Sequence, residues 1–150
     1  MRLLASTDIA LRVLTVLAAE PFGRHLSVEV LAQRLGGLSR NHLHKIVQDL
    51  TALGVVRTVR GAAGGVLLAI LPGEVRVGTL IRQLEQDQPM VECFRADGGL
   101  CVLTPTCRLR GMLHDAKDHF YRALDEHTLA DCIAGLPGRP LAGPPGESGA

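Results

Sequence analysis

The chain has 150 residues, of which 47% are hydrophobic and 21% charged. This is the length and composition of one globular domain, and it excludes a disordered or collagen-like protein. The formal net charge is only +1, but residues 1–65 carry 8 basic and 4 acidic residues, whereas residues 66–150 carry 8 and 11; a basic first half favours an anionic partner, typically nucleic acid.

The start of the chain is predicted to be a core helix rather than an export signal. Ser6 or Thr7 can cap this helix. Asp8 and Arg12 interrupt its apolar residues, and no stretch of the chain approaches the ~18 apolar residues that cross a membrane. We therefore expect a cytoplasmic protein that makes no membrane contact.

Two further helices are predicted directly after the first. Ser27 is placed to cap the second helix and Ser39 to cap the third, and only a short break at Gly36-Gly37 separates them. Helix, short glycine turn and helix is the pattern of a helix-turn-helix.

A hairpin is predicted next. The β-branched run Val55 to Arg60 and the apolar run Val66 to Ile70 flank the glycine-rich residues 61–65. This hairpin is the wing of a winged helix-turn-helix. The expected fold class is therefore mainly α with a two-stranded wing, and the DNA-binding domain is expected to span residues 1–76.

The second part of the chain, residues 77–134, is predicted to hold a short helix, an irregular loop and a long helix. Val77 to Leu84 fits the short helix, and residues 86–107 have no periodicity. The long helix, Thr106 to Leu124, carries a heptad-like apolar seam, which predicts a homodimerisation helix. Residues 135–150, where nine of sixteen are Gly or Pro, are expected to be a disordered tail. The seam residues are Leu109, Leu113, Ala116, Phe120 and Ala123.

The polar positions of the third helix and of the wing are the candidate DNA-binding residues. Short polar and basic side chains opposite the core stripe of a recognition helix reach base edges and phosphates in the major groove. Cations beside the tip of a wing can enter the narrow minor groove. The candidates are Ser39, Arg40, Asn41, His42 and Lys45 on the helix, and Arg57 and Arg60 on the wing.

Three of the four cysteines lie in or at the end of the irregular loop. Seven residues separate Cys93 from Cys101, and five separate Cys101 from Cys107. Structural zinc sites use tighter pairs, whereas wide spacing on a glycine-containing loop suits an iron-sulfur cluster. The fourth ligand could be Cys132, a carboxylate such as Asp8, a His or an exogenous group. Buried or redox-active thiols remain an alternative.

Other chemistry has less support in the sequence. Cys132 lies in the last apolar helix, where we expect a small buried residue, and Asp8 has a sufficient role in favouring a helix dipole. No nucleophile with its base, phosphate loop or catalytic carboxylate pair is recognisable, so we do not expect an enzyme.

Several segments resemble the bacterial winged-helix iron-sulfur regulators, and the resemblance runs from residue 1 to about Ile133. The later segments are most similar to the nitric-oxide-sensing branch of that family. The matching segments are Met1-Arg2-Leu3, Ser6 to Arg12, Ser39 to Val47, Leu53 to Val56, Arg60 to Gly65, Val75 to Gly78, Leu84-Glu85, Leu103 to Leu109, Leu124-Asp125 and Thr128 to Asp131.

The resemblance implies a [4Fe-4S] cluster held by Cys93, Cys101 and Cys107, with Asp8 of the other subunit as fourth ligand. The [2Fe-2S] branch places a His three residues beyond the third cysteine, and this chain has Arg110 there, so [2Fe-2S] is less expected. The implied protein is a homodimeric repressor that binds double-stranded DNA at a palindromic operator and releases it when nitric oxide attacks the cluster.

Two alternatives stay open at this point. The same cluster could respond to iron status or oxidative stress. The cysteines could instead hold a structural zinc ion or form a thiol switch in a winged-helix DNA-binding protein.

Overall fold

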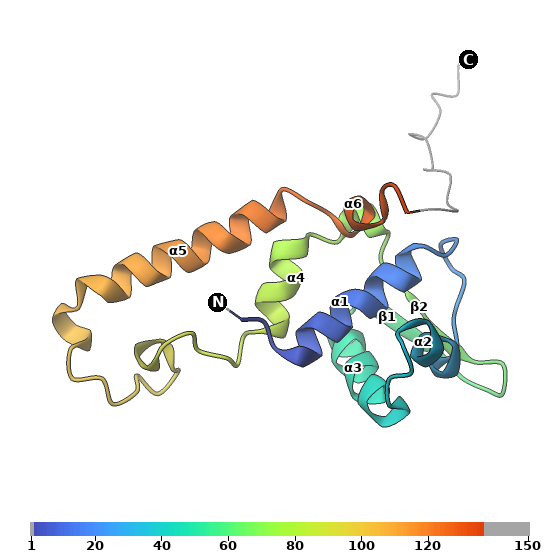
Figure 1. Ribbon diagram of the computed structural model, residues 1–150, viewed down its shortest axis with the longest axis horizontal. Coiled ribbons are helices and arrows are strands. Elements are labelled where there is room, and N and C mark those ends of the chain that lie inside the picture. The colour runs from blue at the N-terminus through green and yellow to red at the C-terminus, as the bar shows by residue number, and fades with distance from the viewer. Residues whose placement is uncertain (1, 137–150) are drawn as a thin grey trace, which may run out of the picture.

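The structure is a computed structural model that describes residues 2–136. Helices gather around α1 on one side, and the long helix α5 projects away from them on the other (Figure 1). The predicted tail, residues 135–150, lies outside the described residues from residue 137 onward. The elements are α1 (Ala5–Ala18), α2 (Val28–Arg34), α3 (Arg40–Ala52), β1 (Val56–Val59), β2 (Gly65–Leu68), α4 (Val77–Leu84), α5 (Arg108–Asp125) and α6 (Leu129–Ile133), with 3-10 turns at Pro72–Glu74, Glu92–Phe94 and Thr104–Thr106.

The predicted helix-turn-helix is confirmed as α2 and α3. The hydroxyl of Ser27 caps α2 by accepting a hydrogen bond from the backbone N–H of Val30 at 3.2 Å. Gly36 and Gly37 have φ of 84° and 79°, a conformation that glycine adopts at little cost, so two residues turn the chain sharply.

The predicted cap of the first helix is wrong. α1 begins at Ala5 with Leu4 in the N-cap position, and no side chain caps it. Thr7 lies inside the helix and is only 1% exposed. The backbone N–H of Leu4 donates to the carboxylate of Glu85 at 2.9 Å, so a residue 81 positions along the chain satisfies the helix start instead.

The wing has the predicted two strands. β1 and β2 are antiparallel, with Val56 opposite Leu68 and Val59 opposite Gly65. Leu26 pairs with Val66 on the other side of β2. A Cβ atom at Gly65 would lie 2.4 Å from the carbonyl oxygen of Leu26, so this close approach requires glycine.

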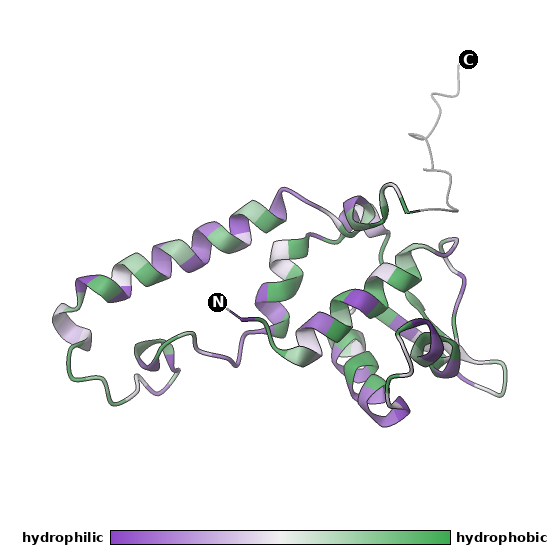
Figure 2. Ribbon diagram, in the orientation of Figure 1, coloured by the Kyte–Doolittle hydropathy of each residue, from purple (hydrophilic) through white to green (hydrophobic). Residues whose placement is uncertain are grey.

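The hydrophobic core lies between α1, α2, α3 and the wing. Leu14, Leu31, Leu43 and Leu50 are fully buried there, and Figure 2 shows hydrophobic segments in α1 and in the helices around it. The last helix, α6, packs against α1 and adds Leu129 and Ile133 to the same core. None of the helices within residues 2–136 is both long and apolar enough to span a membrane.

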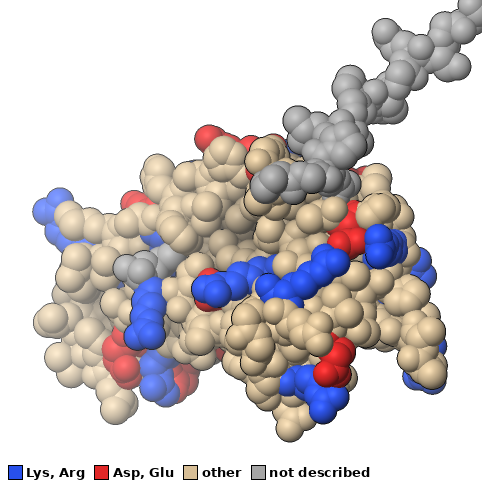
Figure 3. All heavy atoms as spheres, turned by 45° about the vertical axis from the view of Figure 1, so that its right-hand side comes forward, with Lys and Arg blue, Asp and Glu red and all other residues tan. Residues whose placement is uncertain are grey.

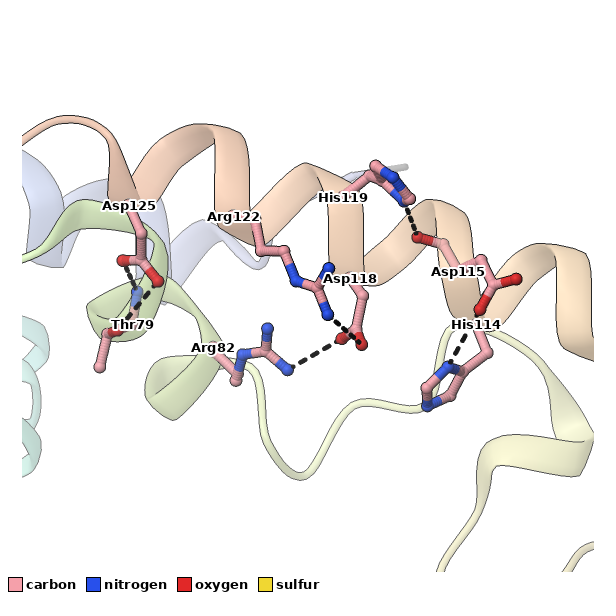
Figure 4. A network of polar contacts seen from close by, with 8 residues as sticks. All are labelled: Thr79, Arg82, His114, Asp115, Asp118, His119, Arg122 and Asp125. Atoms are coloured by element: carbon pink, nitrogen blue, oxygen red, sulfur yellow. Dashed lines mark hydrogen bonds and ion pairs between the residues drawn. The ribbon is translucent and has the colours of Figure 1, made fainter.

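Helix α5 is fixed along α4. The backbone N–H and the hydroxyl of Thr79 donate to the carboxylate of Asp125 at 2.6 and 3.1 Å (Figure 4). Arg82 donates to Asp118 at 3.1 Å, and this guanidinium holds the pKa of Asp118 below its usual value. A Cβ atom at Gly78 would lie 2.0 Å from the carbonyl oxygen of Tyr121, so the two helices touch at backbone distance.

Candidate functional site

The predicted recognition helix, α3, presents its polar side chains to solvent. Its other face is buried through Leu43, Ile46, Val47 and Leu50. The five candidates on this element, Ser39, Arg40, Asn41, His42 and Lys45, are all exposed and lie within its first two turns.

Two of these cations have acidic partners that the sequence interpretation did not include. Arg40 lies 2.9 Å from Glu29 in the first turn of α2, and Lys45 pairs with Asp49 one turn along α3. The Lys45 pair could have been found from its i, i+4 spacing, but the Arg40 pair depends on how α2 and α3 cross. Both pairs are exposed, so a phosphate can replace the carboxylate at small cost.

The wing carries cations without such partners. Arg57 on β1 and Arg60 at its end are exposed, and within residues 2–136 neither forms an ion pair. Figure 3 shows Lys and Arg side chains spread in a broken band across one face of the molecule, with acidic side chains beside several of them. The guanidinium groups of Arg57 and Arg60 are therefore accessible for binding an anion such as a DNA phosphate.

The three loop cysteines are half-buried free thiols, and two of them, Cys93 and Cys107, lie at the start of α5. Cys107 occupies the N-cap position of α5. The carbonyl of Cys93 accepts a hydrogen bond from Nε of Arg110 at 3.4 Å, and the ring of Phe94 packs edge-on against His114 of α5. The backbones of Cys93 and Cys107 are thus both held at the first turns of one helix.

The structure does not gather the predicted ligands. Within residues 2–136, no group of three or more His, Cys, Asp or Glu side chains is arranged to hold a metal ion. Asp8 is exposed on α1, where its carboxylate pairs with Arg12 at 2.7 Å. The donor set nevertheless has the chemistry that iron-sulfur clusters require, because thiolates are their usual protein ligands. Three free thiols on a loop made largely of turns can supply them.

Cys132 differs from its prediction. It was expected to be buried, but it is exposed on α6, with its sulfur 3.6 Å from the carbonyl oxygen of Thr128. Desolvation of the sulfur, and then the charge of Asp131, raise the pKa of this thiol. A raised pKa disfavours the thiolate, the form of cysteine that metals bind.

Comparison with known proteins identifies the family. The model of the Rrf2 family, described as "Iron-dependent Transcriptional regulator", matches residues 3–135. This chain belongs to the Rrf2 family. The HTH-type transcriptional regulator NsrR of Geobacillus kaustophilus is 44% identical over 133 residues, 89% of this chain and 90% of that protein.

Solved structures place this Rrf2 regulator in the same fold. T. potens IscR superposes with a TM-score of 0.68 at 27% identity, over 89% of this chain and 86% of that one. CymR, the global cysteine regulator of B. subtilis, superposes with a TM-score of 0.69 at 26% identity, over 89% and 97% of the two chains. The chain is therefore a winged-helix, DNA-binding transcriptional regulator of the IscR/NsrR type and not an enzyme. The resemblance to the bacterial winged-helix regulators found in the sequence is confirmed, and several of the matching relatives are named NsrR.

Proposed function

We propose that this Rrf2 regulator is a homodimeric repressor that leaves its operator when nitric oxide reacts with a [4Fe-4S] cluster. The observation that carries the proposal is the placement of Cys93, Cys101 and Cys107. These half-buried free thiols lie in or next to one irregular loop that adjoins α5. The sequence resemblance supplies the identity of the signal.

The proposed ligands are these three thiolates and the carboxylate of Asp8. A single chain does not bring Asp8 to the loop, so we assign it to the second subunit. Asp8 stands on the exposed side of α1, where its only pairing is with Arg12 of the same helix among the described residues. An approaching subunit can therefore reach it.

The α5 helix is the proposed dimerisation element. Its buried face meets α4 through Tyr121, which is 2% exposed. Its opposite face is uncovered: Leu109, Met112 and Phe120 are 59%, 60% and 36% exposed. Leu109 and Phe120 belong to the predicted heptad seam, whose spacing suits the same helix of a second copy. Figure 2 shows hydrophobic turns along this projecting helix.

A two-fold dimer fits a palindromic operator. Two winged helices related by symmetry read two half-sites about 34–36 Å apart, one turn of DNA. We assign base and phosphate contacts to α3, and contacts with the minor groove and the DNA backbone to the wing. These residues are Ser39, Arg40, Asn41, His42, Lys45, Arg57 and Arg60.

The chain's own residues connect the loop to the DNA. A cluster held by Cys93, Cys101, Cys107 and Asp8 would supply iron that reacts with nitric oxide. Cys93 and Cys107 are attached to α5, and Asp8 belongs to α1, which packs on α3. Releasing Asp8 therefore frees one subunit's α1 from the other subunit's loop. A coupling of about 1–3 kcal/mol changes operator affinity about 5- to 150-fold.

The test compares operator binding by oxygen-free protein in three forms: cluster-loaded, metal-free and treated with nitric oxide. Iron and sulfide analysis and native mass spectrometry first establish four irons per subunit in a dimer. We expect tight binding by the loaded form alone. Equal binding by all three forms would falsify the switch.

A matched pair of cysteine variants assigns the ligands. Cys101→Ser should lose iron after reconstitution, whereas Cys132→Ser should keep it and respond to nitric oxide like the unaltered protein. Iron retention by Cys101→Ser would remove this residue from the ligand set.

A structural zinc ion or a thiol switch is the second candidate, and one observation favours the thiol switch: Cys93, Cys101 and Cys107 are free thiols. Absorption and metal analysis separate the candidates, since an iron-sulfur protein is brown and a zinc or thiol protein is colourless. Parallel exposure to oxidants and to iron chelators separates nitric oxide from other signals.

A further inference from the structure

The tip of the wing, residues 60–64, has little to hold it in place. Its sequence is Arg-Gly-Ala-Ala-Gly, so most of its side chains are absent or a single methyl group. Within the tip, the backbone N–H of Gly64 donates to the carbonyl of Gly61 at 3.0 Å, and Gly61 has φ of 109°. Such a turn is mobile unless a neighbouring segment restrains it.

His25 supplies that restraint from a distant part of the chain. It precedes Leu26, whose N–H and carbonyl pair with Val66 at 2.9 and 2.8 Å, so His25 is placed beside β2. Its Nε2 lies 2.8 Å from the carbonyl oxygen of Ala63. Because a carbonyl only accepts, Nε2 must carry the proton and donate. No other side chain within residues 2–136 forms a hydrogen bond to the tip.

We infer that His25 is a positioning residue for DNA binding, because it fixes the wing tip so that Arg57 and Arg60 face the DNA backbone. Both guanidiniums are exposed and lack ion-pair partners among the described residues. If the wing tip is already ordered in the free protein, DNA binding does not have to pay the conformational entropy of ordering it. His25 is itself exposed and contributes nothing to the core.

This role predicts which substitutions are tolerated. The side-chain amide of Gln places an N–H donor near the position of Nε2, whereas the shorter amide of Asn reaches only the position of Nδ1. His25→Gln should therefore preserve the hydrogen bond to Ala63, and His25→Asn and His25→Ala should lose it.

The experiment measures binding of the full chain to a duplex of about 30 base pairs, which the unaltered protein has selected from random-sequence DNA. Cluster-loaded, metal-free and as-isolated protein are all assayed, and each variant is compared with the unaltered chain in the same form. We expect His25→Ala and His25→Asn to weaken binding about 2- to 12-fold, the worth of one hydrogen bond. His25→Gln should bind within about twofold of the unaltered protein.

A double-variant cycle and a salt titration separate positioning from general stability. If His25 acts through the wing cations, His25→Ala should cost little further affinity in a chain that already carries Arg57→Ala and Arg60→Ala. In the otherwise unaltered chain, His25→Ala should also make the affinity for DNA depend less steeply on salt concentration. Its thermal unfolding midpoint should stay unchanged. The inference is overturned if His25→Ala costs as much affinity in the chain that lacks Arg57 and Arg60 as in the unaltered chain. It is also overturned if His25→Ala costs no affinity in either chain, or if His25→Gln binds DNA as weakly as His25→Ala.

Discussion

The carboxylate of Asp8 lies 2.7 Å from the guanidinium of Arg12, one turn further along α1. The two side chains are 53% and 60% exposed, so water competes for both groups. An exposed pair of this kind contributes about 0.2–1 kcal/mol. Asp8 therefore has a partner that it can exchange for a metal ion at small cost.

Arg12→Gln should strengthen the proposed iron site, because it removes the competitor for Asp8. We expect iron to leave the cluster-loaded dimer for a chelator up to about fivefold more slowly. Arg24→Gln, which breaks an ion pair with Glu20 in the segment that follows α1, is the matched control and should leave the rate unchanged. Faster iron loss from Arg12→Gln would mean that Arg12 supports the site.

Variants of a base-contacting residue and of a backbone-contacting residue should affect DNA binding in different ways. Asn41→Ala removes a side chain suited to adenine, so affinity should fall about 5- to 150-fold and selectivity at one base pair should relax. Arg57→Ala should weaken binding to all sequences alike and reduce the salt slope by about 1. Arg122→Ala on α5 is the control, and fluorescence anisotropy at several salt concentrations is the measurement. A uniform loss from Asn41→Ala would refute base contact.

Gly78→Ala should destabilise the junction of α4 and α5. The added methyl group would lie 2.0 Å from the carbonyl oxygen of Tyr121, so the helices must separate. Overpacking of this kind costs about 1–3 kcal/mol, measurable as a lower thermal midpoint. Gly111→Ala is the matched control, because nothing lies near its Cβ position and alanine favours the helix. An equal response of both variants would contradict this packing.

The capping box of α6 should make stability depend on acid. The backbone N–H and then the hydroxyl of Thr128 donate to Asp131 and lower the pKa of its carboxyl group. A lowered folded-state pKa gives stability that is present above the unfolded pKa of about 3.9 and is lost as pH falls through the folded value. Asp131→Asn should melt below the unaltered chain at pH 6, and the difference should shrink as pH falls through the lowered folded-state pKa of Asp131. A constant difference would exclude this cause.

Local patterns were sufficient for much of the fold. The helix at Val77–Leu84 and the hairpin occur where they were predicted, because each depends on residues a few positions apart. The start of α1 was mispredicted because Glu85, far along the chain, satisfies the N–H of Leu4. No local signal indicates that contact.

In the candidate sites too, features set by local sequence were predictable and features set by the tertiary structure were not. Exposure of the polar face of α3 follows from helical periodicity, and the structure has it. The mutual placement of Cys93, Cys101 and Cys107 does not follow from spacing, because an irregular loop has no repeating hydrogen bonds to fix it. Cys132 was mispredicted because α6 is only five residues long, and a short helix can leave one side open.

The contact of Thr79 with Asp125, together with the backbone approach at Gly78, leaves α5 little freedom to swing relative to the winged helix. In a dimer joined through α5, this rigid junction of α4 and α5 determines the distance between the two winged-helix domains. Such a protein would discriminate between operators by the spacing of their half-sites as well as by base sequence. An operator whose spacer is altered by a single base pair would then be bound weakly.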